Sequence, residues 1–278
     1  MALRLDEVTG MLDGWYDPSW AEGWDAVGLV CGDPDQPVSR VHLAVDPAPA
    51  VVDEALAWGA DLLVCHHPLL LTPVHGVPAT SPKGRVVHDL LRAGAALFTA
   101  HTNADVPAHG VNEALARAVG IAEPRVVVPT DGAEGSRGHG RLGRLDATLT
   151  LREFAELVSR ALPPTAHGVR VSGDPDRPVR TVVVGSGSGD FMLDAVLSEG
   201  ADVYLTSDLR HHRAAEFREH DGPALVDVAH WAAEWTWLPV VEQLLVDAVR
   251  DRGATVDTRV SRLVTDPWTF RLDPPTTR

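Results

Sequence analysis

The chain has little of what several large classes of protein require. It contains only two cysteines, Cys31 and Cys65, which are too few for a disulfide framework and fit a reducing compartment. No apolar stretch approaches the roughly 18 residues that a membrane-spanning helix needs. The first residues include Asp6 and Glu7, where a signal peptide would be basic and then apolar. We therefore predict a cytoplasmic protein with no membrane partner.

Positive charge is also scarce. The formal net charge is −15, and Lys83 is the only lysine. Broad nucleic-acid binding needs a basic surface, so the charge argues against a nucleic-acid partner. One basic cluster, residues 210–213, could meet an anionic substrate or could form the solvated first turn of a helix. Hydrophobic residues make up 45% of the chain, which is enough for one large domain or two smaller ones.

A histidine pair marks the end of one strand-like run. Residues 62–65 are typical of a buried strand, and Pro68 is expected to terminate it. His66 and His67 stand between them, where a strand that turns into a loop lets neighbouring side chains converge. Neutral imidazole is the commonest protein metal ligand, and strand ends are where α/β folds place their chemistry. The pair therefore indicates a metal site.

Two further strand-like runs, 96–100 and 224–228, end in residues of the same kind. The candidate side chains there are His101, Asp105, His230 and Glu234. In each segment the histidine precedes the carboxylate by four positions, which places both side chains on one face if the segment is helical. A histidine taken alone is more often a hydrogen-bonded structural residue or a helix cap, and that alternative stays open for His101.

The donor set indicates which ions would bind, and how many. Imidazoles with carboxylates suit zinc, iron, manganese, cobalt or nickel. Two or three histidines and two carboxylates exceed what one catalytic ion needs, whereas two ions about 3.5–4 Å apart with a bridging carboxylate would use them all. Cys65 is interpreted as a small buried apolar residue rather than a ligand. We therefore predict two divalent metal ions per chain.

A local pattern occurs twice. A strand, a helix, Gly59-Ala60-Asp61 and a second strand recur 141 positions later around Gly200-Ala201-Asp202. Each glycine is expected to cap its helix. We predict an α/β fold with two related halves, residues 1–125 and 126–278, that arose by internal duplication and face each other across a dinuclear metal site. The alternative is that any two strand–helix–strand units look alike.

The segments around the middle of the chain are expected to be irregular. Residues 122–140 are rich in glycine and proline, which is typical of loops. The Gly-Ser run at 185–189 lacks the order of a nucleotide-binding loop and the context of a serine nucleophile. We interpret this run as a tight strand-to-helix turn near the site. An amphipathic helix is predicted for residues 151–162.

Taken together, the motifs resemble those of the NIF-three-like dinuclear metal centre proteins, also called GTP cyclohydrolase 1 type 2 homologues. The resemblance covers nearly the whole chain. Its segments include Trp24-Asp25, Cys65-His66-His67-Pro68, His101-Thr102-Asn103-Ala104-Asp105, Gly110-Val111-Asn112, Thr206-Ser207-Asp208 and His230-Trp231-Ala232-Ala233-Glu234. Departures from the usual pattern occur at Ala26, Val30, Ser207 and Ala229, which leave the metal ligands intact and concern substrate contacts.

The resemblance implies a specific ligand set and assembly. His67 and Asp105 would hold one ion, His66 and His230 the other, and Glu234 would bridge them. It also implies two related α/β domains, a ring-shaped hexamer and, through the family name, a GTP ring-opening activity. Some family members carry an inserted domain between the halves, and this chain is short by comparison.

Two classes of function fit these residues. In the first, the protein is a metal-dependent hydrolase of a nucleotide or of a small molecule with a cyclic amide or C=N bond. The ions would lower the pKa of a bridging water to about 7, and Asp46, His101 or Asp208 would orient water or shuttle protons. In the second, it is a metal-binding regulatory or scaffold protein without turnover. The mixed N/O donor set leaves coordination positions open, which favours the first class.

Tryptophan is over-used relative to the other aromatic residues, with eight in a chain that is 5% aromatic. Trp15, Trp20 and Trp24 crowd the N-terminal segment. Because indole rings are enriched at interfaces, we expect these three near a subunit contact. Trp231 and Trp235, beside the candidate ligands, are expected to be core or pocket-wall residues. We therefore predict a closed assembly, with the hexamer as the form that the resemblance implies.

Overall fold

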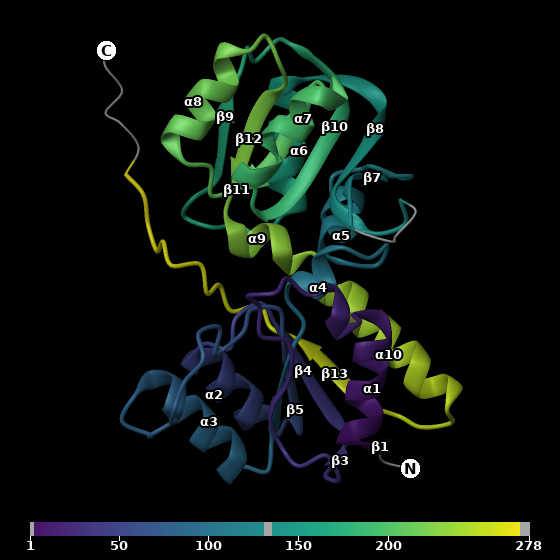
Figure 1. Cartoon of the computed structure of the whole chain (residues 1–278), viewed down its shortest axis with the longest axis vertical. Coiled ribbons are helices and arrows are strands. Elements are labelled where there is room, and N and C mark those ends of the chain that lie inside the picture. Colours follow the sequence, from purple (N-terminus) through teal and green to yellow (C-terminus); the bar gives the residue numbers. More distant parts are fainter. Residues whose placement is uncertain (1–2, 131–134, 273–278) are drawn as a thin grey trace. The chain divides into compact units, whose positions relative to one another are not determined.

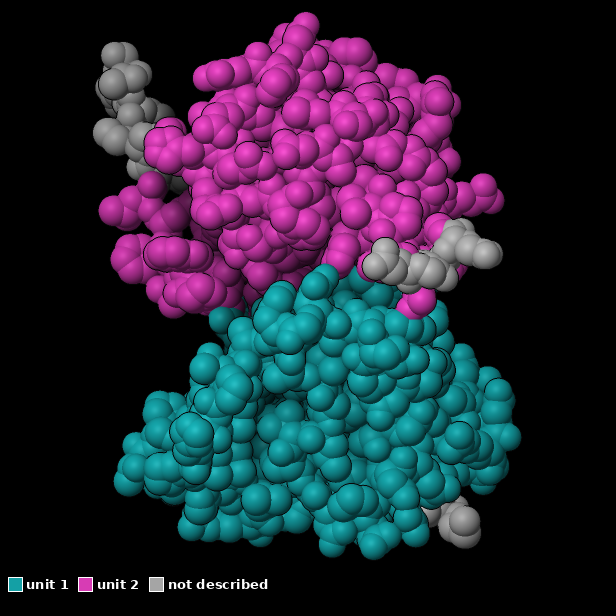
Figure 2. Space-filling model, viewed as in Figure 1, with its two compact units in different colours: residues 1–111, 237–265 teal, residues 112–236, 266–278 magenta. Residues whose placement is uncertain are grey.

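The computed structural model describes residues 3–130 and 135–272. The chain divides into two compact units, which Figure 2 shows in different colours. Unit 1 comprises Met1–Val111 and Trp237–Thr265, and unit 2 comprises Asn112–Thr236 and Asp266–Arg278. This division differs from the predicted halves in residues 112–125 and 237–265. In the described part of the chain, no helix is both long enough and apolar enough to cross a membrane.

Unit 1 is built on a five-stranded sheet with the order β13-β4-β5-β6-β2 (Figure 1). All neighbouring strands are parallel except β2 and β6. The strands are β2 (Gly28–Cys31), β4 (Arg40–Ala44), β5 (Leu62–Cys65), β6 (Ala96–Thr99) and β13 (Asp257–Val260). A separate two-stranded sheet pairs β1 (Leu3–Arg4) with β3 (Pro37–Val38). The central strand β5 is buried along its whole length, as expected of a parallel strand covered on both faces.

Two helix pairs lie on opposite sides of the unit 1 sheet (Figure 1). The first pair is α2 (Pro49–Trp58) and α3 (Pro82–Arg92), which join the parallel strands, and the second is α1 (Leu5–Trp15) and α10 (Leu238–Asp251). The side chains of α2 and α3 pack against Leu63, Cys65 and Leu97 in one apolar cluster. This unit also has two short helices. The 3-10 helix η1 (Pro18–Trp20) follows α1, and α4 (Thr102–Asp105) follows β6.

Unit 2 is built on a six-stranded sheet with the order β7-β8-β10-β11-β12-β9. The pairs β10–β11 and β11–β12 are parallel, and the outer pairs are antiparallel. Its strands are β7 (Arg125–Pro129), β8 (Gly138–Thr150), β9 (Val169–Ser172), β10 (Pro178–Ser188), β11 (Val203–Ser207) and β12 (Ala224–Val228). Its helices are α5 (Val111–Ala118), α6 (Leu151–Ala161), η2 (Asp190–Met192), α7 (Leu193–Glu199), α8 (His211–Glu219) and α9 (His230–Trp235). The mixed α/β fold that the sequence predicts is confirmed.

The repeated sequence pattern has the same local structure in both units. Gly59 ends α2 and Gly200 ends α7, each in the left-handed conformation, with φ of 77° and 64°, so the predicted caps are confirmed. Two residues after each cap, an aspartate accepts hydrogen bonds from two successive backbone N–H groups of a preceding strand region. Asp61 accepts from residues 39 and 40, and Asp202 accepts from residues 180 and 181, so these contacts also recur 141 positions apart.

Two expectations about irregular segments are wrong in part. Residues 122–140 contain β7 and the start of β8, because the β-branched run Val126-Val127-Val128 pairs with β8 despite its glycine- and proline-rich surroundings. The expected loop at residues 131–134 lies outside the described residues. The Gly-Ser run at 185–189 is largely the end of β10 rather than a tight turn. The predicted helix at 151–162 is confirmed as α6, which begins with a capping box between Thr150 and Glu153.

Candidate metal centre

Unit 1 brings three histidines together at the carboxyl ends of two neighbouring parallel strands. His66 and His67 follow β5, and their backbone N–H groups donate to Ala44 and Val45, which continues the pairing with β4. His101 follows β6. Possible donor atoms of His66, His67 and His101 all lie within 4.8 Å of one another. Asp105, at the end of α4, places Oδ1 at 3.8 Å from Nε2 of His66.

Each of these imidazoles is held through Nδ1 by an oxygen atom. His66 Nδ1 lies 2.8 Å from the carbonyl oxygen of Ala100, and His67 Nδ1 lies 2.7 Å from Oδ1 of Asp46. His101 Nδ1 lies 2.8 Å from Oδ1 of Asp25. Carbonyl and ionised carboxylate oxygens only accept hydrogen bonds, so Nδ1 carries the proton. The neutral ring then has its lone pair on Nε2, which is the arrangement typical of metal-binding histidines.

One histidine of unit 2 also has an oxygen acceptor at Nδ1. His230 begins α9 directly after β12, and its Nδ1 lies 2.7 Å from Oδ2 of Asp208. Its Nε2 lies 2.8 Å from Oε1 of Glu234, one helical turn later. Asp208 has a left-handed backbone with φ of 55°, which is uncommon outside glycine but enriched in aspartate. This turn after β11 presents the Asp208 carboxylate to the ring.

The electrostatics around His230 favour a cation. Burial opposes the charged imidazolium, but the negative charge of Glu234 and the hydrogen bond with Asp208 outweigh it and raise the pKa of His230 to about 11. Beside His101, the group whose pKa is shifted is the carboxyl group of Asp25. Burial works to raise the pKa of Asp25, but hydrogen bonds from His101 and Thr102 hold that pKa well below its usual range. Carboxylate charge is thus maintained beside imidazole in both units.

The end of β10 approaches the unit 2 pair closely. Gly187 has φ of 68°, and a Cβ atom there would lie 3.1 Å from Oε1 of Glu234 and 3.5 Å from Cε1 of His230. A glycine at this position therefore leaves room for both side chains. This is the structural role of the Gly-Ser run, and it agrees with the prediction that the run lies near the candidate ligands.

The residues proposed for catalysis have identifiable contacts. Asp46 and Asp208 each accept from the Nδ1 atom of a candidate ligand, and His101 stands among the candidate ligands themselves. Sequence reasoning missed the contact of Asp25 with His101. The available signal was the Trp24-Asp25 motif. The Trp24 ring lies edge-on to His101, with ring centroids 6.0 Å apart.

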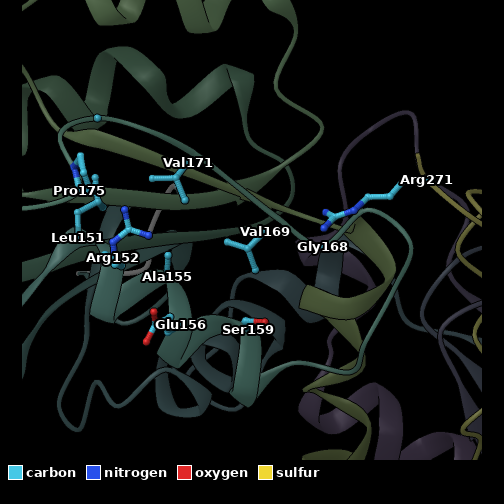
Figure 3. A pocket seen from close by; sticks show the side chains of 11 residues that line it. Leu151, Arg152, Ala155, Glu156, Ser159, Gly168, Val169, Val171, Pro175 and Arg271 are labelled. Carbon is cyan, nitrogen blue, oxygen red and sulfur yellow. The ribbon is translucent and has the colours of Figure 1, made fainter. Parts of the chain in front are cut away.

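The basic cluster at residues 210–213 is largely neutralised within unit 2. Arg210 pairs with the buried Asp190, and Arg213 lies 3.8 Å from Asp194. These contacts favour the helix-turn interpretation over an anion site, since the cluster leads into α8. A separate cavity of about 410 Å³ lies in the same unit between α6 and β9 (Figure 3). No candidate metal ligand lines that cavity.

A mixed α/β fold with imidazole and carboxylate donors at its strand ends is typical of a metal-binding protein. The family model for Duf34/NIF3 (NGG1p interacting factor 3) matches residues 3–267. The chain therefore belongs to the Duf34/NIF3 family, as the sequence motifs predict.

Curated relatives and solved structures agree with this placement. A GTP cyclohydrolase 1 type 2 homolog from Streptomyces coelicolor is 51% identical over 272 residues, which is 97% of this chain and 95% of the relative. A protein of the same name from Mycobacterium tuberculosis is 35% identical, covering 96% of this chain and 97% of the relative, and its alignment spans 373 positions because it has residues that this chain lacks. A Staphylococcus aureus structure is 26% identical with a TM-score of 0.88, covering 98% and 100% of the two chains.

If Asp25 orients His101 for metal binding, replacing it with asparagine should weaken that binding. Asp25→Asn removes the carboxylate charge at Nδ1, and loss of such a supporting contact typically lowers metal affinity about 10–100-fold. Competition with a chelating dye measures the affinity, and circular dichroism checks that the variant is folded. Asp53→Asn, on the exposed face of α2, is the matched control and should leave affinity unchanged. Equal affinities for folded Asp25→Asn and wild type would contradict the role.

Proposed function

We propose that the protein binds two divalent metal ions and is a metal-dependent hydrolase of a nucleotide or of a small molecule with a cyclic amide or C=N bond. The observation that carries the proposal is the hydrogen bonding at Nδ1 of four histidines. His66, His67, His101 and His230 each have an oxygen acceptor at Nδ1. Structural histidines need no such uniformity, whereas metal ligands commonly have it.

The ligand assignment follows the sequence motifs. We assign His67 and Asp105 to one ion and His66 and His230 to the other, with Glu234 as the bridge. Asp105 lies 3.8 Å from His66 in unit 1, and Glu234 lies 2.8 Å from His230 in unit 2, so each carboxylate stands beside a candidate imidazole ligand. These contacts support the ligand set, whereas its division between the two ions rests on the family resemblance. Nitrogen and oxygen donors of this kind suit zinc, iron, manganese, cobalt or nickel.

The bound ions and the protein's own side chains would have different roles in the reaction. Bound ions would polarise a substrate oxygen or C=N bond and lower the pKa of a coordinated water to about 7. Asp46 and Asp208 would keep the proton on Nδ1 of His67 and His230 and so fix their orientation. His101, with its Nδ1 held by Asp25, would move a proton at Nε2 or serve as a further ligand. The names of the curated relatives support a nucleotide substrate.

A metal-binding regulatory or scaffold protein without turnover is the second candidate, because the same ligands would serve it. A cytoplasmic location is proposed for either function, since Cys31 and Cys65 are both free thiols. We also propose that the sequence halves 1–125 and 126–278 arose by duplication. The support is the pair of glycine caps and the pair of aspartate contacts that recur 141 positions apart.

A turnover screen distinguishes the two candidates. Metal-loaded protein is assayed against nucleotides and small cyclic amides, and we expect turnover that a chelator abolishes. Glu234→Gln keeps the side-chain size but removes charge that would offset two dications. One ion should therefore be lost before the other, and the activity should be lost with it. Glu216→Gln, an exposed residue on α8, is the control. Two bound ions without turnover of any compound would favour the regulatory candidate, and retention of both ions by Glu234→Gln would show that this residue is not the bridge.

The assembly is proposed to be a hexamer. Its support is the family resemblance together with the N-terminal tryptophans, of which Trp24 is 60% exposed in the single chain while Trp15 and Trp20 are half-buried. An indole ring with that exposure is typical of an interface residue. Light scattering of the purified protein should give a mass near six chains. A monomer mass across micromolar concentrations would contradict both the assembly and this role for the tryptophans.

A further inference from the structure

A cavity in unit 1 adjoins the candidate metal ligand His67. Its volume is about 330 Å³, near the lower end of the roughly 300–1,000 Å³ that small-molecule sites occupy. The cavity lies where α2 and α3 begin, beside the loop that follows β5. Its lining includes Asp46, Ala48, His67, Lys83 and Thr265. A cavity of this size suits a single small molecule.

The walls of this cavity are mostly apolar. Four prolines, Leu69 and Val86 contribute rings and branched side chains without hydrogen-bonding groups. Proline side chains are closed into a ring and have no freely rotating bonds, so they offer apolar surfaces whose shape changes little on binding. Such walls favour a planar ring over a flexible polar molecule, because the ring loses little conformational freedom and buries its faces.

Lys83 supplies the cavity with a positive charge. It is the only lysine in the chain, it is exposed, and its ammonium group forms no ion pair with any described residue. The carboxylate in the lining, Asp46, is engaged by Nδ1 of His67 and by the hydroxyl of Thr265, which moderates its repulsion of an anion. Both helices that begin here, α2 and α3, also direct their positive ends to this region.

We propose that this cavity is the substrate pocket of the metal centre and that it takes a planar heterocycle carrying one acidic group, a carboxylate or a phosphate, which pairs with Lys83. The ring lies against the prolines, and the edge opposite the acidic group lies toward His67. This inference rests on the proposed function for its catalytic meaning, but binding in the cavity is measurable without turnover.

The single lysine provides a direct reporter. Reductive methylation with ¹³C-formaldehyde keeps the charge and gives one dimethyl-lysine signal in the NMR spectrum, separate from that of the α-amino group. Two matched probe pairs differ only in the acidic group: orotate with uracil, and GMP with guanosine. Orotate or GMP should shift the Lys83 signal, whereas uracil, guanosine and inorganic phosphate should not. The acidic group is identified within the pairs: a larger shift with orotate than with uracil shows that a carboxylate is accepted, and a larger shift with GMP than with guanosine shows that a phosphate is accepted.

Affinity measurements on unmethylated, metal-loaded variants complete the test. Lys83→Ala should weaken binding of the tighter acidic probe about three- to fivefold, as expected for one partly solvated charge pair, and Lys83→Arg should restore it. Arg85→Ala removes the same charge from the same helix outside the cavity and should have no effect. Ala48→Phe should fill the cavity and abolish binding, since Ala48 makes no capping hydrogen bond that the change would remove.

Several results would overturn the proposal. The first is equal probe affinity for wild type and Lys83→Ala, and the second is unchanged probe binding by Ala48→Phe. The third is a Lys83 signal that shifts as much with the uncharged member of each probe pair as with the acidic member. The fourth is a full shift with inorganic phosphate alone. Metal content, measured on every variant, separates this inference from the proposed function. Probe binding with two ions but no turnover would leave the pocket standing and remove the hydrolase. Turnover that is independent of Lys83 and Ala48 would support the hydrolase and show that this cavity is not its substrate pocket.

Discussion

The hydrogen bond at histidine Nδ1 is the interaction on which the candidate site depends. An imidazole presents a defined lone pair to a metal only if its tautomer and its ring orientation are fixed, and an oxygen acceptor at Nδ1 fixes both. The acceptor is a backbone carbonyl for His66 and a carboxylate for His67, His101 and His230. A carboxylate also offsets the charge that a dication would bring.

The parallel sheets explain how these contacts are kept in place. In unit 1, β4, β5 and β6 end at one edge, so that Asp46, His67 and His101 emerge from three adjacent strands. β5 and β6 are buried and paired along their whole length, which fixes the backbone up to the residues that carry the site. In unit 2, β11 and β12 present Asp208 and His230 in the same manner. The rigid strands thus provide precision, and the loops after them provide the chemistry.

Much of this organisation could be predicted from the sequence. Buried strands followed at once by histidines identify the site edge, and the repeated Gly-Ala-Asp identifies the helix caps, because both depend on local residue order. The Trp24-Asp25 motif marks Asp25, but the sequence does not say which side chain Asp25 contacts, since 76 positions separate it from His101. Strand β7 could not be predicted, because the strand-forming valines of residues 126–128 find their partner only when β8 lies alongside.

The metal content of the purified protein tests the central claim most directly. Elemental analysis should find about two divalent ions per chain in the wild type. Replacing both His66 and His67 with alanine should remove most of this metal while circular dichroism shows the fold retained, because both side chains follow the end of β5 rather than lying within it. A metal-free wild type that takes up no divalent ion when these are supplied, or a double variant that keeps its full metal content, would contradict the account.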